Sequence, residues 1–309
     1  MRELTDTKQF LALSKPFPSS IACKVADFFA LSKIKLSLLV VITSALGYWL
    51  AFKEPIAQNP NWSTVHFLVT VLGILCFVFS ANALNQVMER EFDALMERTK
   101  NRPLPSGRMN VLEATAIALV IGSIGAYLLF SFTNLLTLVL ALVAWSVYLF
   151  AYTPLKRKTP FCTAVGAISG ALPPVIGWTA VKGEIGLGAA LLFSLQFLWQ
   201  FPHFWLIAWM YSDDYSKAGF KVLPKLPTHL LTKLIVGSTA LVVLIGTFPV
   251  ATNLTYFWLH FSLAFAIGCW LLVLTFRFSV SPSRPIARNL LALVDAYLPL
   301  ILLVWLFKT

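Results

Sequence analysis

The stretch VHFLVTVLGILCFVFSANALNQVMEREFD, residues 65–93, is an apolar run that ends in a line of polar side chains. Its first part, Val65–Leu84, contains no Asp, Glu, Lys or Arg. It has about the 20 residues that an α-helix needs to cross the hydrocarbon of a bilayer. Only helices and closed barrels satisfy their own backbone hydrogen bonds inside lipid. The stretch therefore predicts a transmembrane helix whose polar end emerges from the membrane.

The rest of the chain repeats this pattern. Of 309 residues, 58% are apolar and 12% are charged, against roughly 25% charged in a soluble protein. This composition excludes a soluble enzyme, a disordered chain and a nucleic-acid-binding protein, although the net charge is +11. We predict an all-α polytopic membrane protein, a single domain over residues 1–309, with nine transmembrane helices around a central cavity. The predicted spans lie near Ile34–Ala51, Val65–Leu84, Val111–Phe130, Leu135–Ala151, Phe161–Val181, Leu187–Met210, Leu230–Val250, Phe257–Phe276 and Leu290–Phe307.

The basic residues give this bundle an orientation. Loops on alternate sides of the predicted spans hold 21 and 3 of the 24 Lys and Arg residues. Cytoplasmic loops carry the excess of positive charge in membrane proteins. We therefore expect a cytoplasmic N-terminal arm, residues 1–30, and two cytoplasmic active-site loops, residues 89–110 and 212–228. The C-terminus would lie on the opposite side.

The first long loop combines acids and bases. Asn85, Glu89 and Asp93 are spaced four residues apart, which places them on one face of a continuing helix. Two carboxylates one turn apart repel each other, and a Mg²⁺ ion with one or two carboxylate ligands would relieve that repulsion. The bases Arg98, Lys100 and Arg102 follow and could bind phosphate oxygens. Spacing alone leaves open an ordinary charged loop that only sets the orientation.

Three further groups face the same side in this topology. Asp213 and Asp214 could form a second metal site or orient lysines on a diphosphate. Lys156 and Arg157 could bind the oxygens of a diphosphate, or their positive charge could serve only to orient the protein in the membrane. His203 stands among aromatic residues near the membrane rim, where it could contact a ligand or be purely structural.

Together these motifs resemble the protoheme IX farnesyltransferase family, whose members are also called heme O synthases. The likeness runs from about Lys33 to Val304 and rests on residues 85–93, on MERTKNRPL at 96–104, YTPLKRKTP at 152–160, ALPPVIGW at 171–178 and PHFW at 202–205, and on the Asp-Tyr, Ala-Gly and Leu-Pro pairs at 214–224. The wider group of intramembrane aromatic prenyltransferases is similar in having nine helices around a central cavity. Two departures are visible. The family motif often has Asp where Glu89 and Glu91 stand, and the wider group has two Asp four residues apart where Asp213 and Asp214 are adjacent.

The resemblance implies transfer of a farnesyl group from farnesyl diphosphate to a vinyl group of heme B, with addition of water, giving heme O and diphosphate. It implies Mg²⁺ as cofactor, a bacterial-type inner membrane with the active site facing the cytoplasm, and heme A synthase or terminal oxidase assembly as partners. The catalytic residues would be Asn85, Glu89, Asp93, Asp213 and Asp214, with Asn85, Glu89, Asp93 and Asp214 as metal ligands. The substrate-binding residues would be Arg98, Lys100, Arg102, Tyr152, Lys156, Arg157, His203 and Tyr215.

Two other functions compete with this interpretation. A prenyltransferase of the same architecture could act on a quinone precursor or another aromatic acceptor. A secondary transporter would place ionisable residues at the bilayer midplane, where only Asp295 is clearly found. Asp295 itself could be a structural acceptor for a neighbouring helix or a residue of the substrate cavity.

Overall fold

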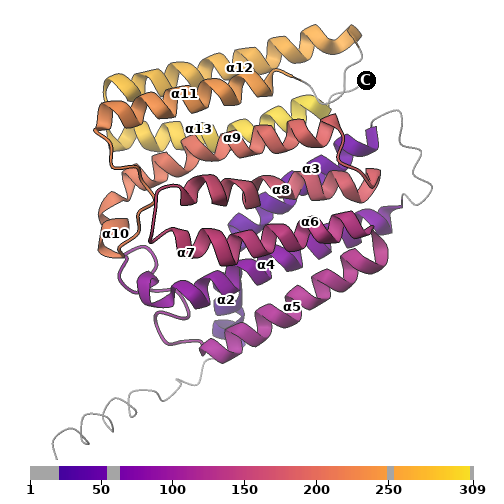
Figure 1. Cartoon of the computed structure of the whole chain (residues 1–309), viewed down its shortest axis with the longest axis vertical. Coiled ribbons are helices and arrows are strands. Elements are labelled where there is room, and N and C mark those ends of the chain that lie inside the picture. The colour runs from indigo at the N-terminus through magenta and orange to yellow at the C-terminus, as the bar shows by residue number, and fades with distance from the viewer. Residues whose placement is uncertain (1–20, 54–62, 249–253, 307–309) are drawn as a thin grey trace, which may run out of the picture.

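The computed structural model describes residues 21–53, 63–248 and 254–306. Within them every regular element is a helix, and the long helices run side by side as one bundle (Figure 1). The helices are α2 (Ile21–Ser32), α3 (Ile34–Lys53), α4 (Thr64–Asp93), α5 (Val111–Phe132), α6 (Leu135–Ser146), the π-helix η1 (Val147–Tyr152), α7 (Thr153–Leu155), α8 (Cys162–Lys182), α9 (Leu187–Met210), α10 (Ser212–Lys217), α11 (Thr228–Gly246), α12 (Leu254–Val280) and α13 (Arg284–Leu306). The predicted all-α membrane fold is confirmed.

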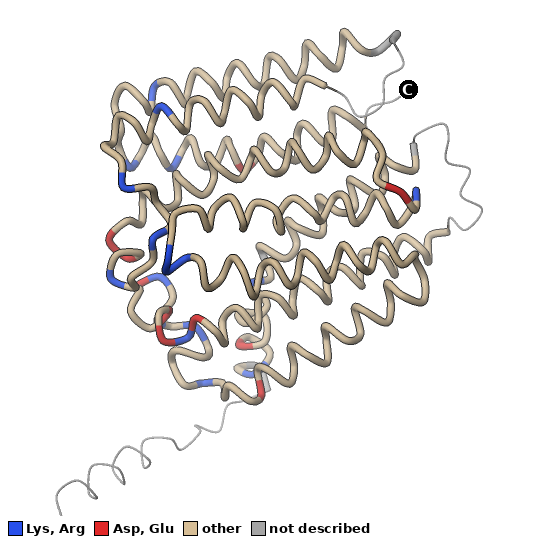
Figure 2. Tube along the Cα trace, viewed as in Figure 1, with Lys and Arg blue, Asp and Glu red and all other residues tan. Residues whose placement is uncertain are grey.

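The number of spans is close to the prediction. Eight helices in the described part of the chain are long and apolar enough to cross a membrane, with α6, η1 and α7 counting as one, Leu135–Leu155. The remaining predicted span, Ile34–Ala51, corresponds to α3, whose apolar part, Leu36–Phe52, is shorter. Lys, Arg, Asp and Glu residues gather mainly at one end of the bundle (Figure 2), as the topology requires.

Some helices extend beyond the predicted spans. Helix α4 continues to Asp93, so the polar residues after Leu84 lie on the same helix as the apolar run. Helix α13 begins at Arg284, six residues before the predicted start. Pro285 suits the first turn of a helix, where its missing N–H is not needed. Residues 1–20 of the predicted N-terminal arm lie outside the described residues, and all of the remainder, residues 21–30, belongs to α2.

Helix α8 is the central helix of the bundle. It packs against α3, α6, η1 and α9, and nearly all of its side chains are buried. Glycines allow the closest of these contacts, because a Cβ on Gly47 of α3 would collide with the backbone of Pro174 and one on Gly177 with that of Ser44. Small residues let membrane helices approach in this way. The α3–α8 pair therefore forms a rigid wall behind the cavity described below.

The π-helix η1 shapes another wall. A π-bulge adds a residue to one turn and often marks a functional site. Here the side chains of Tyr148, Tyr152 and Lys156 line one cavity. Gly166 of α8 makes room for the Tyr152 ring, because a Cβ at that position would come within 2.7 Å of it.

Candidate active site

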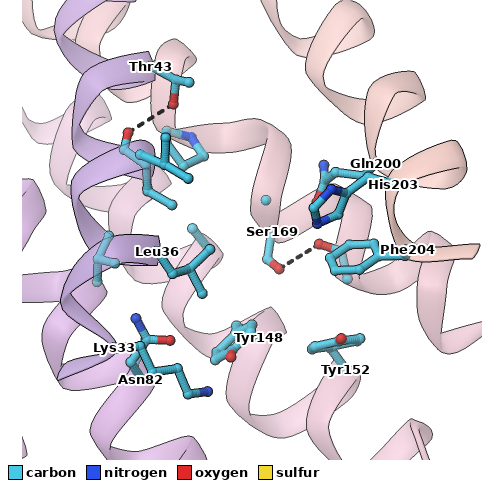
Figure 3. Close-up of a pocket in the computed structure, with 18 of the residues that line it drawn as sticks. Lys33, Leu36, Thr43, Asn82, Tyr148, Tyr152, Ser169, Gln200, His203 and Phe204 are labelled. Carbon is cyan, nitrogen blue, oxygen red and sulfur yellow. Dashed lines mark hydrogen bonds between the residues drawn. The ribbon is translucent and has the colours of Figure 1, made fainter. Parts of the chain in front are cut away.

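A cavity of about 420 Å³ lies among α3, α4, α6, η1, α8, α9 and α13. Most of its lining is apolar or aromatic, and side chains from the segments 96–102 and 215–222 complete it at the charged end of the bundle. Figure 3 shows Lys33, Tyr148 and Tyr152 toward one end of this space and Thr43 toward the other. The cavity thus joins a polar end to an apolar interior.

Two ion pairs form the polar end. Glu89 accepts from Lys156 Nζ at 2.8 and 3.0 Å through its two carboxylate oxygens. Asp93 Oδ2 accepts from Arg102 Nη1 at 2.7 Å. Both acids line the cavity and are buried, with 6% and 1% of their surface exposed. Buried charges need such partners. Burial lowers the pKa of Lys156, but Glu89, Tyr148 and Tyr215 together outweigh burial and the net shift of this pKa is upward, so the amine remains charged.

Lys33 joins this cluster although sequence reasoning treated it only as an orientation charge. It lies between α2 and α3, and its Nζ donates to Asn85 Oδ1 at 2.8 Å. The Asn85 amide in turn donates to Thr153 Oγ1 at 3.0 Å. Burial, and then repulsion by Arg102 and Lys156, lowers the pKa of Lys33 to about 7. Its position immediately before a span was the one signal in the sequence that could have identified it.

Aromatic rings hold two of the other cations. The Arg98 guanidinium lies 5.3 Å from the Tyr211 ring centre and 5.7 Å from that of Tyr215. Arg98 also donates to the Tyr215 hydroxyl at 3.3 Å. Lys156 Nζ lies 4.6 Å from the Tyr152 ring centre. These cation–π contacts orient the exposed Arg98 and the largely buried Lys156 at the charged end of the cavity.

The structure separates the predicted site residues into two sets. Eight line the cavity: Glu89, Asp93, Arg98, Arg102, Tyr152, Lys156, His203 and Tyr215. The other five, Asn85, Lys100, Arg157, Asp213 and Asp214, do not.

These five residues have other surroundings. Asn85 is fully buried behind the cavity wall, and Arg157 lies over the Phe92 ring at 4.3 Å. Lys100 pairs with Glu97 at 2.6 Å on the surface. The exposed Asp213 lies 3.6 Å from Arg284, and Asp214 beside it is half-buried.

The described residues contain no group of three or more His, Cys, Asp or Glu side chains that could hold a metal ion. Mg²⁺ does not require one, because it usually takes one or two carboxylates and completes its shell with water and substrate phosphate. Glu89 and Asp93, one turn apart and both facing the cavity, are chemically suited to such an ion.

A second polar group lines the wall made by α9 and α13. His203 Nδ1 and Asp295 Oδ1 lie 2.6 Å apart. The His203 ring stacks on Trp199 with centroids 4.8 Å apart, and Trp199 Nε1 donates to the Val294 carbonyl at 2.6 Å. Asp295 lines the cavity and also bonds His203 of another helix, so it is both a structural acceptor and a cavity residue; contact with a substrate stays a prediction.

Comparison with known proteins gives consistent matches. Residues 40–294 match the model of the UbiA prenyltransferase family. The chain is 38% identical to a protoheme IX farnesyltransferase from Koribacter versatilis, over 96% of this chain and 97% of that protein. A structure of digeranylgeranylglyceryl phosphate synthase has a TM-score of 0.71 at 16% identity, covering 92% of this chain and 97% of that one. A UbiA homologue from Archaeoglobus fulgidus, bound to GPP and Mg²⁺, has a TM-score of 0.65 at 17% identity, covering 91% and 100%.

Proposed function

The chain belongs to the UbiA prenyltransferase family, and from that premise we propose that it transfers a farnesyl group from farnesyl diphosphate to a vinyl group of heme B, with addition of water, to give heme O and diphosphate. The full-length likeness to protoheme IX farnesyltransferases carries this assignment. The cavity supports it, because a cationic end that can bind a diphosphate opens into an apolar and aromatic space suited to apolar parts of the two substrates.

The diphosphate would bind at the end where Lys33, Arg102 and Lys156 meet. Arg98, which donates to the Tyr215 hydroxyl, also lines the cavity. Arg presents a planar set of donors that matches phosphate oxygens, while Lys acts as a point charge. As the bond from the farnesyl carbon to oxygen breaks, these donors stabilise the charge that builds on the leaving group.

We propose Glu89 and Asp93 as the ligands of Mg²⁺. A bound Mg²⁺ would neutralise charge on the diphosphate oxygens. Both carboxylates are engaged by Lys156 and Arg102 in this structure. A metal and a diphosphate arriving together would supply each acid with a cation and each base with an anion. The pairs would therefore exchange partners and leave no buried charge uncompensated.

The residues outside the cavity wall keep supporting places in the proposal. Asn85 would position Lys33 through its amide oxygen, and that oxygen would complete the metal shell only when Lys33 turns to the diphosphate. Asp213 and Asp214 would form a second acidic site, with Asp214 as metal ligand, if α10 moved toward the cavity that Tyr215 already lines. Lys100 and Arg157 would add positive charge at the mouth.

The apolar interior would protect the reactive intermediates. A farnesyl cation and the cation formed on the heme side chain both react with water, so the site must exclude water until it is needed. Aromatic side chains such as Trp145, Trp199 and Phe204 line this space. His203, among them, would lie beside the heme.

The protein is an integral multi-pass membrane protein. We propose that it is one domain in a bacterial-type inner membrane with its charged end on the cytoplasmic side, where a water-soluble diphosphate could leave. Heme A synthase or a terminal oxidase in assembly would be the partner that receives heme O.

The direct test is to supply purified protein with heme B, farnesyl diphosphate and Mg²⁺ and to analyse the product by mass spectrometry. We expect a heme whose mass has risen by one farnesyl group plus one hydroxyl, and no product when Mg²⁺ is removed by a chelator. A parallel reaction with an aromatic quinone precursor tests the alternative acceptor. Prenylation of that compound, with heme B unchanged, would overturn the assignment.

A further inference from the structure

The proposed reaction releases a proton, and the acids at the diphosphate end of the cavity are already paired with cations. Water that captures the cation on the heme side chain must lose one hydrogen as a proton, and a positioned base accelerates such a step. At the polar end of the cavity, Glu89 and Asp93 are neutralised by Lys156 and Arg102. The remaining acid–base groups in the described cavity wall are Lys33, the tyrosines, and the pair His203–Asp295.

The geometry favours that pair. The carboxylate of Asp295 engages His203 Nδ1 at 2.6 Å, which leaves Nε2 as the nitrogen available to water. Stacking on Trp199 and the bond from Trp199 to Val294 fix the ring against α13. Figure 3 shows His203 on the cavity wall beside Gln200 and Phe204.

The backbone adds a further polar group nearby. Pro299 lies inside α13, so the Asp295 carbonyl lacks its usual helical N–H donor. The wall near His203 therefore offers acceptors for a water molecule in an otherwise apolar space.

We propose that His203 is the catalytic base for water addition and that Asp295 is its positioning residue, an inference that rests on the proposed function above. The terminal vinyl carbon of heme B bonds to the farnesyl carbon, while diphosphate leaves with the electron pair of the broken C–O bond. This leaves a positive charge on the side-chain carbon next to the porphyrin ring.

The water oxygen then bonds to that carbon, and one water proton passes to His203 Nε2. The Asp295 carboxylate, whose side chain is 45% exposed, balances the charge of the resulting imidazolium, as the carboxylate does in other Asp–His pairs. The imidazolium later releases this proton to solvent, so no oxidant or reductant is needed. The net products are heme O, diphosphate and one proton.

Two other roles would give different results. A carboxylate-bound histidine also suits axial ligation of the heme iron. A diphosphate oxygen could instead accept the proton, which would leave the pair without a catalytic task. The ratio of two products separates these possibilities. A cation that water does not capture loses a neighbouring C–H proton, giving a farnesylated heme lighter by one water.

The experiment measures this ratio by mass spectrometry in single turnovers of detergent-purified His203→Ala, His203→Gln, Asp295→Asn and Asp295→Glu proteins. His229→Gln is the matched control, because His229 is exposed at the start of α11, outside the cavity. We expect the ratio of hydroxylated to dehydrated product to fall about tenfold or more in both His203 variants, below the usual 10²–10⁴-fold contribution of a base because a carbocation also reacts with unassisted water. Asp295→Asn should lower it less, and Asp295→Glu should restore it toward that of the unmodified protein.

The heme absorption spectrum tests axial ligation, and its band positions should not change in the His203 and Asp295 variants. The product ratio is taken over all farnesylated heme, so a change in total turnover does not alter it. An unchanged product ratio in all variants that fold would overturn the proposal in favour of the diphosphate as base. A changed heme spectrum in His203→Gln would overturn it in favour of axial ligation. If the unmodified protein yields no farnesylated heme of either kind, the proposed function fails instead.

Discussion

The protein has two acidic motifs on segments that precede charged loops, and the structure treats them differently. Glu89 and Asp93 end a 30-residue helix, lie almost entirely buried and each pair with a cation. Asp213 and Asp214 begin α10, a helix of six residues, and Asp213 meets only the exposed Arg284. A long helix projects its last turn into the bundle, whereas a short one stays at the rim. The comparison teaches that the burial and the partners of an acidic motif depend on the length and position of the helix that carries it.

The bases of the first loop show the same contrast between residues two positions apart. Arg102 holds Asp93 and lines the cavity, while Lys100 pairs with Glu97 on the surface. An exposed pair of this kind contributes little, because water screens it and two long side chains must be ordered. Neighbours in the sequence therefore have separate roles in the structure.

The largest expected effect is at the buried acids. Asp93→Asn should lower turnover about 10²–10³-fold, roughly 3–4 kcal/mol, because it weakens the hold on the Mg²⁺ that would stabilise the leaving group as the bond breaks. Glu89→Asp should keep substantial activity, since it retains the carboxylate and restores the commoner family residue. The rate of heme O formation by each variant is measured over a range of Mg²⁺ concentrations, and heme binding shows whether the variant is folded. A near-normal rate for Asp93→Asn would move the metal assignment to Asp213 and Asp214.

The paired bases should give the next effect. Arg102→Gln should cost about 10–10²-fold in kcat/KM for farnesyl diphosphate, because it removes a charged donor from the site and leaves Asp93 unpaired. Lys100→Gln, the matched control, should change it by about twofold or less. Steady-state kinetics with varied farnesyl diphosphate decide the matter. Equal losses in the two variants would mean that the loop acts only through its total charge.

A smaller effect is expected at α10. The double variant Asp213→Asn, Asp214→Asn should lower kcat/KM about tenfold, because these acids reach the diphosphate only when α10 moves inward and solvent screens them otherwise. Its effect should fall below that of Asp93→Asn in the same assay. A loss as large as that of Asp93→Asn would show that both acidic motifs contact the reacting diphosphate equally.

The last prediction concerns orientation and not reaction rate: it tests which side of the membrane the charged end of the bundle faces. In a variant lacking the four native cysteines, Ser106→Cys should react with a membrane-impermeant reagent only from the cytoplasmic side. Glu184→Cys, in the loop between α8 and α9, should react only from the opposite side. Labelling of both positions from one side would contradict the orientation inferred from the 21 and 3 basic residues.

The sequence by itself determined the membrane fold and one part of the site. Apolar runs of about 20 residues and a backbone that must satisfy itself in lipid leave helices as the solution here. The spacing of Glu89 and Asp93 is a local property of one helix, and both acids do line the cavity. The same four-residue spacing predicts that the helix of the second span continues to Asp93, and α4 does end there.

Only the tertiary structure decided which distant side chains meet. Lys33 and Asn85 are 52 residues apart, and His203 and Asp295 are 92 apart, so no local period links them. Their contacts depend on how α3, α4, α9 and α13 pack around α8, and on close approaches that glycines such as Gly177 permit. Packing of side chains over long separations sets these distances, because hydrophobicity places helices in the membrane but does not specify which faces of those helices meet.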